Sequence, residues 1–207
     1  MSAKYLRMSN EKPDSKALDE VVACLKNGGL IIYPTDTVYG IGCDVTNAKA
    51  LTKLARFKGV KPEKANFAII CHDLSHLSEF AKVSTPIYKL LKRAFPGAYT
   101  FILNASPKLP KFFKGKKTMG IRIPENNIPR AIVERLGQPI ITTSVHDEDQ
   151  IIEYTTDPQM IFDNFKNQVE LIIDGGYGNN IPSSIIDCTE DEPKIIREGL
   201  GDINIIY

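Results

Sequence analysis

Short apolar runs alternate with stretches of helical periodicity along this chain, and few folds accommodate that pattern. Residues 18–25 carry apolar side chains at helical spacing, Asp14 or Ser15 can cap that helix, and residues 27–29 end it. Residues 30–33 are apolar throughout and stop at Pro34, as expected of a buried strand. The alternation predicts an α/β (or α+β) fold in which helices flank a large mixed sheet.

The same pattern continues to the end of the chain. Helices are predicted from Asn47 to about Phe57, from Thr85 to the break at residues 96–97, and from a cap at Asn127 to Gly137. The first dozen residues are expected to form a loose arm or an edge strand. Strands are predicted over residues 66–71, 99–103, 118–123, 140–144, 169–173, 184–187 and 195–197.

Composition limits the class of protein. The chain has 207 residues, of which 26 are basic and 25 acidic, so the net charge of +1 excludes a strongly basic nucleic-acid coat. We expect a single domain over residues 1–207. No apolar run is long enough for a membrane span, and the polar start of the chain favours a cytoplasmic location. The four cysteines lie far apart and are expected to be reduced thiols.

Standard catalytic motifs are absent from the sequence. There is no phosphate-binding GxxxxGK[ST] loop, no GxGxxG and no GxSxG. His72 and His76 are four residues apart without a third ligand, so we expect a surface pair and no metal site.

Small polar and basic residues instead gather where the predicted strands end. The loop after Pro34 is consistent equally with a ligand loop and with a tight turn capped by hydroxyls. Arg56 and Lys58 can hold a polyphosphate or simply form a solvated helix end. Arg122 interrupts an apolar strand, which requires an anionic ligand or an acidic neighbour such as Asp187.

Seven such segments occur in one order, and together they resemble the YrdC/YciO family. The family pattern runs PTDTVYGLG, Lys-x-Arg, PGPxT, G-x-R-x-P, TSAN, ST-x-x-D and R-x-G. This chain has PTDTVYGIG, RFKGVK, PGAYT, GIRIP, TTSVH, SSIID and REG, so the resemblance spans residues 15–200.

The resemblance implies a fold, an activity and partners. Family members are single α/β domains with a concave, basic cavity in a large twisted sheet. The YrdC-type members join threonine, bicarbonate and ATP into threonylcarbamoyl-AMP, release pyrophosphate and thereby support the modification of adenosine 37 in tRNA. ATP is therefore expected as a substrate, with Mg²⁺, and tRNA, double-stranded RNA and tRNA-modification proteins as partners.

The resemblance also assigns roles residue by residue. Lys58 and Arg122 are implied in catalysis, with Lys58 at the nucleotide phosphates and Arg122 at the threonine carboxylate. The residues implied in binding the nucleotide are Lys58, Thr118, Ser144 and Arg197. Those implied in binding the amino-acid substrate are Thr35, Arg122, Thr142 and Ser183.

Three departures from the pattern suggest the YciO branch. Val60 stands where Lys-x-Arg has its arginine, and His146 replaces the asparagine of TSAN. Ala98-Tyr99 replaces the second proline of PGPxT and the residue after it. Arg56 or Lys61 can substitute for the missing arginine. The alternative prediction is therefore a YciO-like paralogue that binds nucleotide or double-stranded RNA without efficient synthase activity.

Overall fold

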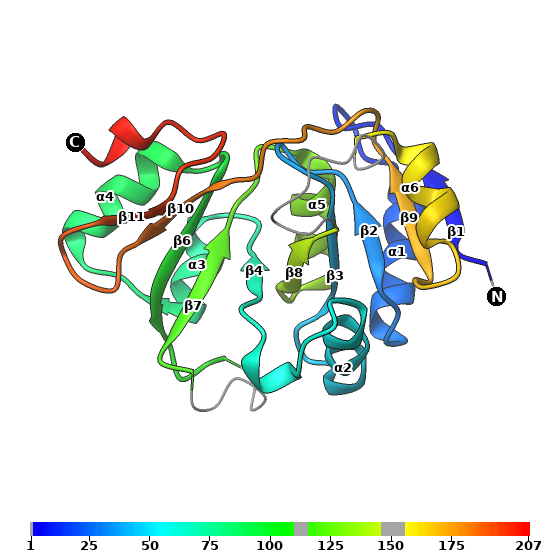
Figure 1. Ribbon diagram of the computed structural model, residues 1–207, viewed down its shortest axis with the longest axis horizontal. Helices are drawn as coiled ribbons and strands as arrows, with labels where there is room; N and C mark the ends of the chain where they lie inside the picture. Colours follow the sequence, from blue (N-terminus) through cyan, green and yellow to red (C-terminus); the bar gives the residue numbers. More distant parts are fainter. Residues whose placement is uncertain (1, 110–115, 146–155) are drawn as a thin grey trace.

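The computed structural model of the protein describes residues 2–109, 116–145 and 156–207, which form one 11-stranded mixed sheet (Figure 1). The strands run in the order β1-β9-β2-β3-β8-β4-β7-β6-β10-β11, and β5 pairs with β6. Parallel and antiparallel neighbours are mixed, as in the parallel pair β4/β7 and the antiparallel pair β3/β8. The predicted α/β class with a large mixed sheet is confirmed.

The elements have the following bounds. The strands are β1 Lys4–Arg7, β2 Ile31–Tyr33, β3 Gly40–Asp44, β4 Ala68–Ile70, β5 Ala81–Lys82, β6 Tyr99–Ala105, β7 Thr118–Arg122, β8 Ile140–Ser144, β9 Leu171–Asp174, β10 Ser184–Asp187 and β11 Lys194–Arg197. The α-helices are α1 Ser15–Lys26, α2 Ala48–Phe57, α3 Leu74–Phe80, α4 Thr85–Ala94, α5 Asn127–Leu136 and α6 Pro158–Phe165, with 3₁₀ turns at Pro62–Lys64 and Ile203–Ile206.

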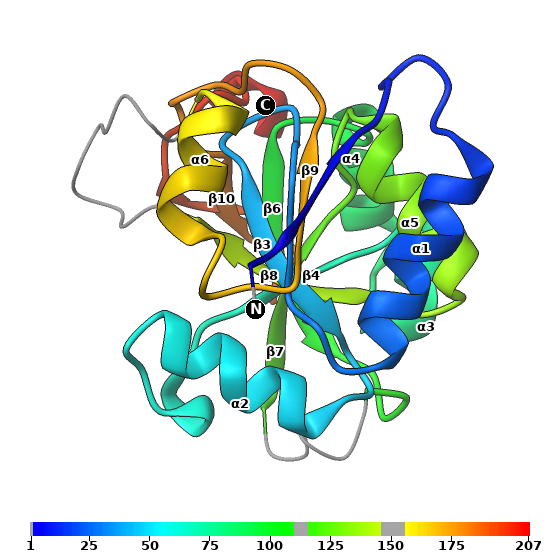
Figure 2. The same cartoon turned by 90° about the vertical axis from the view of Figure 1, so that its right-hand side faces the viewer.

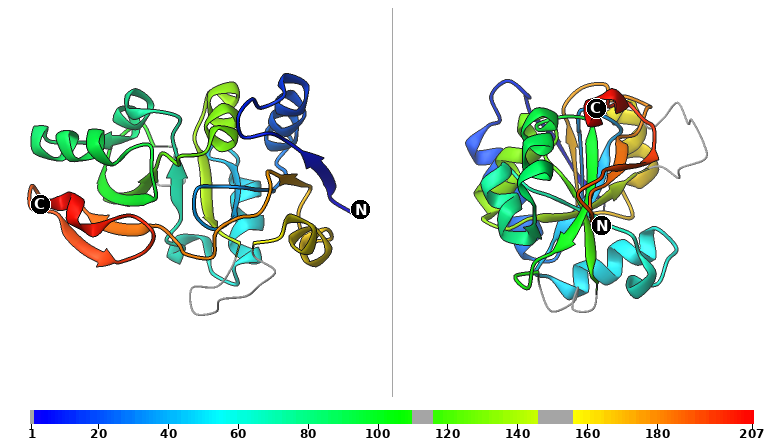
Figure 3. Two further views of the ribbon diagram at one scale, coloured as in Figure 1. Left: turned by 90° about the horizontal axis from the view of Figure 1, so that it is seen from above. Right: turned by 90° about the vertical axis from the view of Figure 1, so that its left-hand side faces the viewer.

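The buried apolar side chains form two clusters. Helices α2, α3, α4 and α6 contribute to one continuous core, whereas α1 and α5 form a second, smaller core against β2, β8 and β9. Figure 2 shows α1 and α5 on one side of the sheet and α2 and α6 on the other. The termini lie at opposite ends of the long axis, as Figures 1 and 3 agree. Within the described residues, no helix is long and apolar enough to cross a bilayer.

Two expectations about local structure were wrong. Asn126, and not Asn127, caps α5, because its side chain accepts the Ile128 N–H at 3.0 Å while Asn127 already has helical geometry. Residues 40–44, where no strand is predicted, form strand β3, whose glycines allow close packing that the apolar pattern does not reveal.

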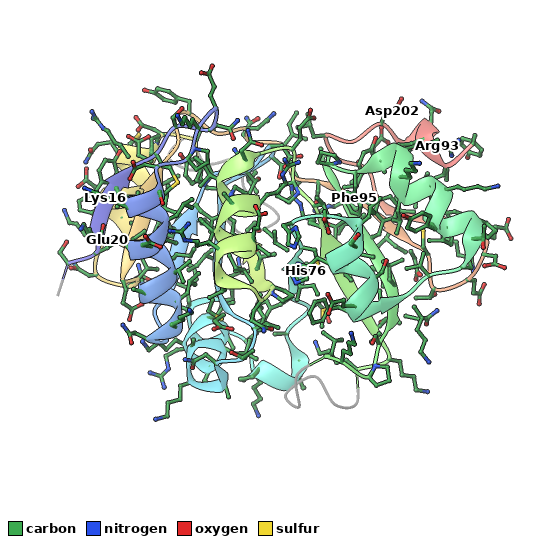
Figure 4. The ribbon with its side chains drawn as sticks, turned by 180° about the vertical axis from the view of Figure 1, so that it is seen from behind. Lys16, Glu20, His76, Arg93, Phe95 and Asp202 are labelled. Atoms are coloured by element: carbon green, nitrogen blue, oxygen red, sulfur yellow. The ribbon has the colours of Figure 1, made fainter. Side chains whose placement is uncertain are left out.

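The two histidines do not form the expected surface pair. His76 lies on α3, is 8% exposed and packs edge-on against Phe80, while its ring stacks on His72 with 4.5 Å between centroids. Figure 4 shows His76 on the face that α3 and α5 cover. The 3.6-residue period places His76 on the buried side of α3, a helix that the sequence analysis did not predict.

Candidate functional site

The loop that follows β2 carries Thr35, the first of the predicted site residues. Thr35 is buried, and its hydroxyl donates to the Val38 carbonyl at 2.8 Å while accepting the Thr37 N–H at 3.0 Å. These bonds close a tight turn, so the turn interpretation of this loop holds alongside any ligand role. The Thr35 oxygen also lies 3.1 Å from the Thr37 hydroxyl, so Thr35 has no uncommitted proton to offer a ligand.

Strand β7 places Arg122 at the floor of the site. Ile121 and Ile123 are 0% and 2% exposed in the core, and strand alternation turns Arg122 to the other face. Its Nη2 lies 2.6 Å from Oδ1 of Asp36, and both side chains are about one-tenth exposed. The acidic neighbour is therefore Asp36 and not Asp187, which instead accepts hydrogen bonds from Thr189.

This ion pair leaves hydrogen-bonding capacity unused. Among the described residues, neither Nε of Arg122 nor Oδ2 of Asp36 has a hydrogen-bond partner, although both atoms are buried. Burial lowers the pKa of the Arg122 guanidinium, and the Asp36 carboxylate acts in the opposite direction. An unsatisfied N–H on a buried cation is costly unless a ligand accepts from it.

Strands β6, β10 and β11 form the opposite wall. The Thr100 and Ser183 hydroxyls lie 2.8 Å apart, and Nη2 of Arg197 donates to the Ser183 carbonyl at 3.0 Å. The segment 175–183 that links β9 to β10 crosses the top of the sheet in Figure 1 and carries Ser183 to this wall. Residues far apart in sequence thereby meet around one depression.

That depression, the inner pocket, has a volume of about 110 Å³. Six of the eight predicted site residues line it: Thr35, Arg122, Thr142, Ser144, Ser183 and Arg197. Lys58 is absent from the lining, but it caps the end of α2 and its Nζ reaches the Ser144 carbonyl at 3.4 Å. His146 lies outside the described residues.

Thr118 lies in a larger neighbouring cavity, the outer pocket, of about 730 Å³. The two pockets share Asn66, Ala68, Thr100 and Ile185, so they form one continuous depression. Lys64, Lys116 and Lys117 line the outer pocket. Burial lowers the pKa of Lys116, whose Nζ donates to the Ala65 carbonyl.

Sequence reasoning missed several residues of this depression. Asp36 belongs to the PTDTVYG segment and Thr100 to the PGAYT segment, but neither is among the predicted site residues. The sequence did contain one signal for the outer pocket: the adjacent cations Lys116 and Lys117 directly precede the strand that carries the motif residue Arg122.

Metal binding by the protein alone finds little support in these side chains. Neither pocket is lined by a carboxylate, and the described residues contain no group of three or more metal-ligating side chains. The oxygen atoms that the lining does offer are those of hydroxyl and carbonyl groups.

Comparison with known proteins places this geometry in a family. The Sua5/YciO/YrdC family model, described as "Telomere recombination", matches residues 23–199. Escherichia coli YciO, an uncharacterized protein, is 36% identical over 97% of this chain and 98% of its own length. Its crystal structure matches with a TM-score of 0.91 over 99% of this chain and 100% of that one, at 34% identity.

More distant relatives have a stated activity or ligand. The threonylcarbamoyl-AMP synthase of Bacillus subtilis is 28% identical over 87% of this chain, which spans 52% of that enzyme. The structure of P. abyssi Sua5 complexed with L-threonine has a TM-score of 0.83 at 26% identity, over 96% of this chain and 58% of that one. With the family model covering most of the chain and YciO similar along its whole length, the protein belongs to the Sua5/YciO/YrdC family.

Proposed function

We propose that the protein forms threonylcarbamoyl-AMP from threonine, bicarbonate and ATP. The observation that carries the proposal is the Arg122–Asp36 pair, which is buried at the floor of the inner pocket and retains an unused guanidinium N–H. A guanidinium matches a carboxylate in a two-point fork, which suits the amino-acid carboxyl group. The similarity to a threonylcarbamoyl-AMP synthase and to Sua5 complexed with L-threonine supports this assignment.

The chemistry requires positioning and charge neutralisation, with no protein nucleophile. The threonine nitrogen attacks bicarbonate, forming a carbamate and releasing water. A carbamate oxygen then attacks the α-phosphorus of ATP, and the bond to the β-phosphate oxygen breaks to release pyrophosphate. Lys58, Arg197 and the outer-pocket lysines would neutralise the phosphates, and Mg²⁺ would accompany the nucleotide.

In the proposed arrangement the amino acid occupies the inner pocket. Arg122 binds the carboxylate, and Thr35, Thr142 and Ser183 contact the remaining polar atoms. Thr118, Ser144, Lys58 and Arg197 contact the nucleotide, which extends into the outer pocket. The proposal treats residues 1–207 as one domain acting in the cytoplasm, with tRNA or double-stranded RNA and tRNA-modification proteins as downstream partners.

A second candidate is a YciO-like protein that binds nucleotide or double-stranded RNA without efficient synthesis. The observation that favours it is Val60, which replaces the arginine of Lys-x-Arg and is 42% exposed. The loss of one cation weakens the hold on a polyphosphate. The identity to uncharacterized YciO, 36%, also exceeds the 28% identity to the Bacillus enzyme.

Pyrophosphate release from ATP distinguishes the two candidates. With magnesium, threonine and bicarbonate present, the proposal expects release that stops when either threonine or bicarbonate is omitted. An Arg122→Met/Asp36→Leu variant should lose this release, whereas Arg93→Met, which alters an exposed arginine on α4, should retain it. No release above the control without threonine would refute the synthase, and ATP binding without release would favour the second candidate.

A further inference from the structure

A buried tyrosine that does not line the inner pocket is hydrogen-bonded to a residue that does. Tyr33 is 0% exposed, and its hydroxyl oxygen lies 2.5 Å from Oγ1 of Thr142. The two residues lie on β2 and β8, with β3 between them in the sheet.

Glycines on β3 make this reach possible. Gly40 pairs with Tyr33, and a Cβ added there would lie 3.1–3.2 Å from three atoms of the tyrosine side chain. A Cβ on Gly42 would collide with the Ile141 carbonyl and also lie 3.4 Å from the Tyr33 ring. The ring therefore crosses β3 over its two glycines.

The direction of the Tyr33–Thr142 hydrogen bond follows from the surroundings of the tyrosine. A buried hydroxyl proton without an acceptor carries a desolvation cost, and Thr142 Oγ1 is the only hydrogen-bond partner of the Tyr33 hydroxyl within the described residues. If Thr142 donated instead, the buried Tyr33 proton would have no acceptor among the described residues. The tyrosine proton therefore points to Thr142. Burial raises the pKa of Tyr33, which keeps that proton in place.

We infer that Tyr33 is a positioning residue. Its hydroxyl donates to the Thr142 oxygen, which leaves the Thr142 proton free to be donated to an oxygen atom of a ligand in the inner pocket. Thr142 then matches a carboxylate, carbamate or phosphate oxygen. Thr35 differs, because its proton is donated to the Val38 carbonyl and its oxygen already lies within hydrogen-bond distance of the Thr37 N–H and hydroxyl. Resting on the proposed function, the direction of the Tyr33–Thr142 bond orients an amino-acid carbamate with its oxyanions toward Thr142 and Arg122.

A double-mutant cycle tests whether Tyr33 acts through Thr142. The variants are Tyr33→Phe, Thr142→Val and their combination, and the measurement is calorimetric binding of L-threonine with ATP present. We expect Tyr33→Phe to weaken L-threonine binding about 3- to 10-fold, and to have no further effect once Thr142 is valine. Thr142→Ser keeps the hydroxyl, so it should bind L-threonine more tightly than Thr142→Val and close to the wild-type affinity.

Tyr39→Phe is the matched control, because Tyr39 is 1% exposed and its hydroxyl donates to the Gly176 carbonyl at 2.6 Å. It should lose stability comparably to Tyr33→Phe without changing L-threonine affinity. Additive losses in the cycle, or equal losses of affinity in the control, would overturn the inference.

NMR of the ligand-free protein separates this inference from the proposed function. The Tyr33 hydroxyl proton should exchange slowly and show a nuclear Overhauser effect to the Thr142 methyl group, while the Thr142 hydroxyl proton exchanges quickly. The reverse order of exchange would overturn the inference even in an active enzyme. A wild-type protein that shows the expected exchange order but binds no L-threonine would refute the proposed function and leave the hydrogen-bond direction supported.

Discussion

Arg122 pairs with Asp36 and is the proposed carboxylate-binding residue, and these two roles determine how its replacement should behave. Its Nη2 contacts Asp36, while its buried Nε has no hydrogen-bond partner among the described residues. Arg122→Met leaves the Asp36 carboxylate buried and unpaired, so we expect unfolding in urea to show a loss of about 3–5 kcal/mol. Arg122→Met/Asp36→Leu removes both charges and should recover most of that stability, yet bind no L-threonine by calorimetry.

The single and double variants therefore separate folding from binding. A single variant as stable as the wild type would show that the ion pair contributes little to folding. A double variant that still binds L-threonine would remove Arg122 from the proposed carboxylate site.

Val60 is the residue at which nucleotide affinity should be adjustable. Its side chain is 42% exposed just beyond the end of α2, so an arginine fits there without displacing core atoms. A charge-assisted contact contributes about 1.5–3 kcal/mol, so Val60→Arg should tighten ATP binding roughly 10- to 150-fold. Calorimetry with ATP and magnesium measures the change.

Tyr88→Arg, on α4, adds the same charge at a site of equal exposure and should leave ATP affinity unchanged. If Val60→Arg binds ATP no more tightly than the wild type, Arg56 or Lys61 already supplies the missing cation. Loss of ATP binding on Arg56→Ala or Lys61→Ala would then identify which of the two does so.

At the scale of single elements, the N-cap of α5 is expected to stabilise the start of that helix, which follows β7. Asn126 accepts the Ile128 N–H and has extended backbone geometry, as an N-cap requires. Asn126→Ala should cost about 1 kcal/mol, which corresponds to a fall of roughly 2–4 °C in melting temperature.

Asn127→Ala is the matched variant one residue later. It removes hydrogen bonds to the Asn10 carbonyl and to Arg130 that are exposed to water, so the expected change stays within about 0.5 kcal/mol. Equal losses for the two asparagines in thermal unfolding would contradict the assignment of Asn126 as the cap.

At the scale of the whole molecule, strand periodicity carried more information than any local signal for a site. Alternation in residues 118–123 correctly sends Ile121 and Ile123 into the core and Arg122 to the other face. It cannot identify Asp36 as the partner, because that pairing joins loop and strand residues 86 positions apart. The glycines of β3 hid a central strand for a related reason: their use becomes visible only when the Tyr33 ring lies across them.

The buried thiols connect stability to pH across the whole fold. Burial raises the pKa of Cys43 and of Cys188 to about 12, and both side chains are nearly inaccessible to solvent. Their stabilising effect is complete below the unfolded-state pKa of about 8.5 and is lost as the pH rises toward the folded value, because the unfolded chain releases its protons first. Between pH 8 and 10 we therefore expect unfolding free energy to fall, by about 2 kcal/mol per buried thiol at pH 10.

Urea unfolding at a series of pH values measures this alkaline limb. Cys43→Ala lowers stability at neutral pH through lost packing, but it removes one titrating thiol and should flatten the fall between pH 8 and 10. Cys24→Ala is a second test on α1, where the thiol is only partly buried and its pKa is raised to about 11. Between pH 8 and 10 this thiol also ionises little in the folded protein, so its removal should reduce the fall in stability about as much as Cys43→Ala does. A limb whose slope is the same in wild type and in Cys43→Ala would mean that the thiol ionises without unfolding, and that this part of the core admits water.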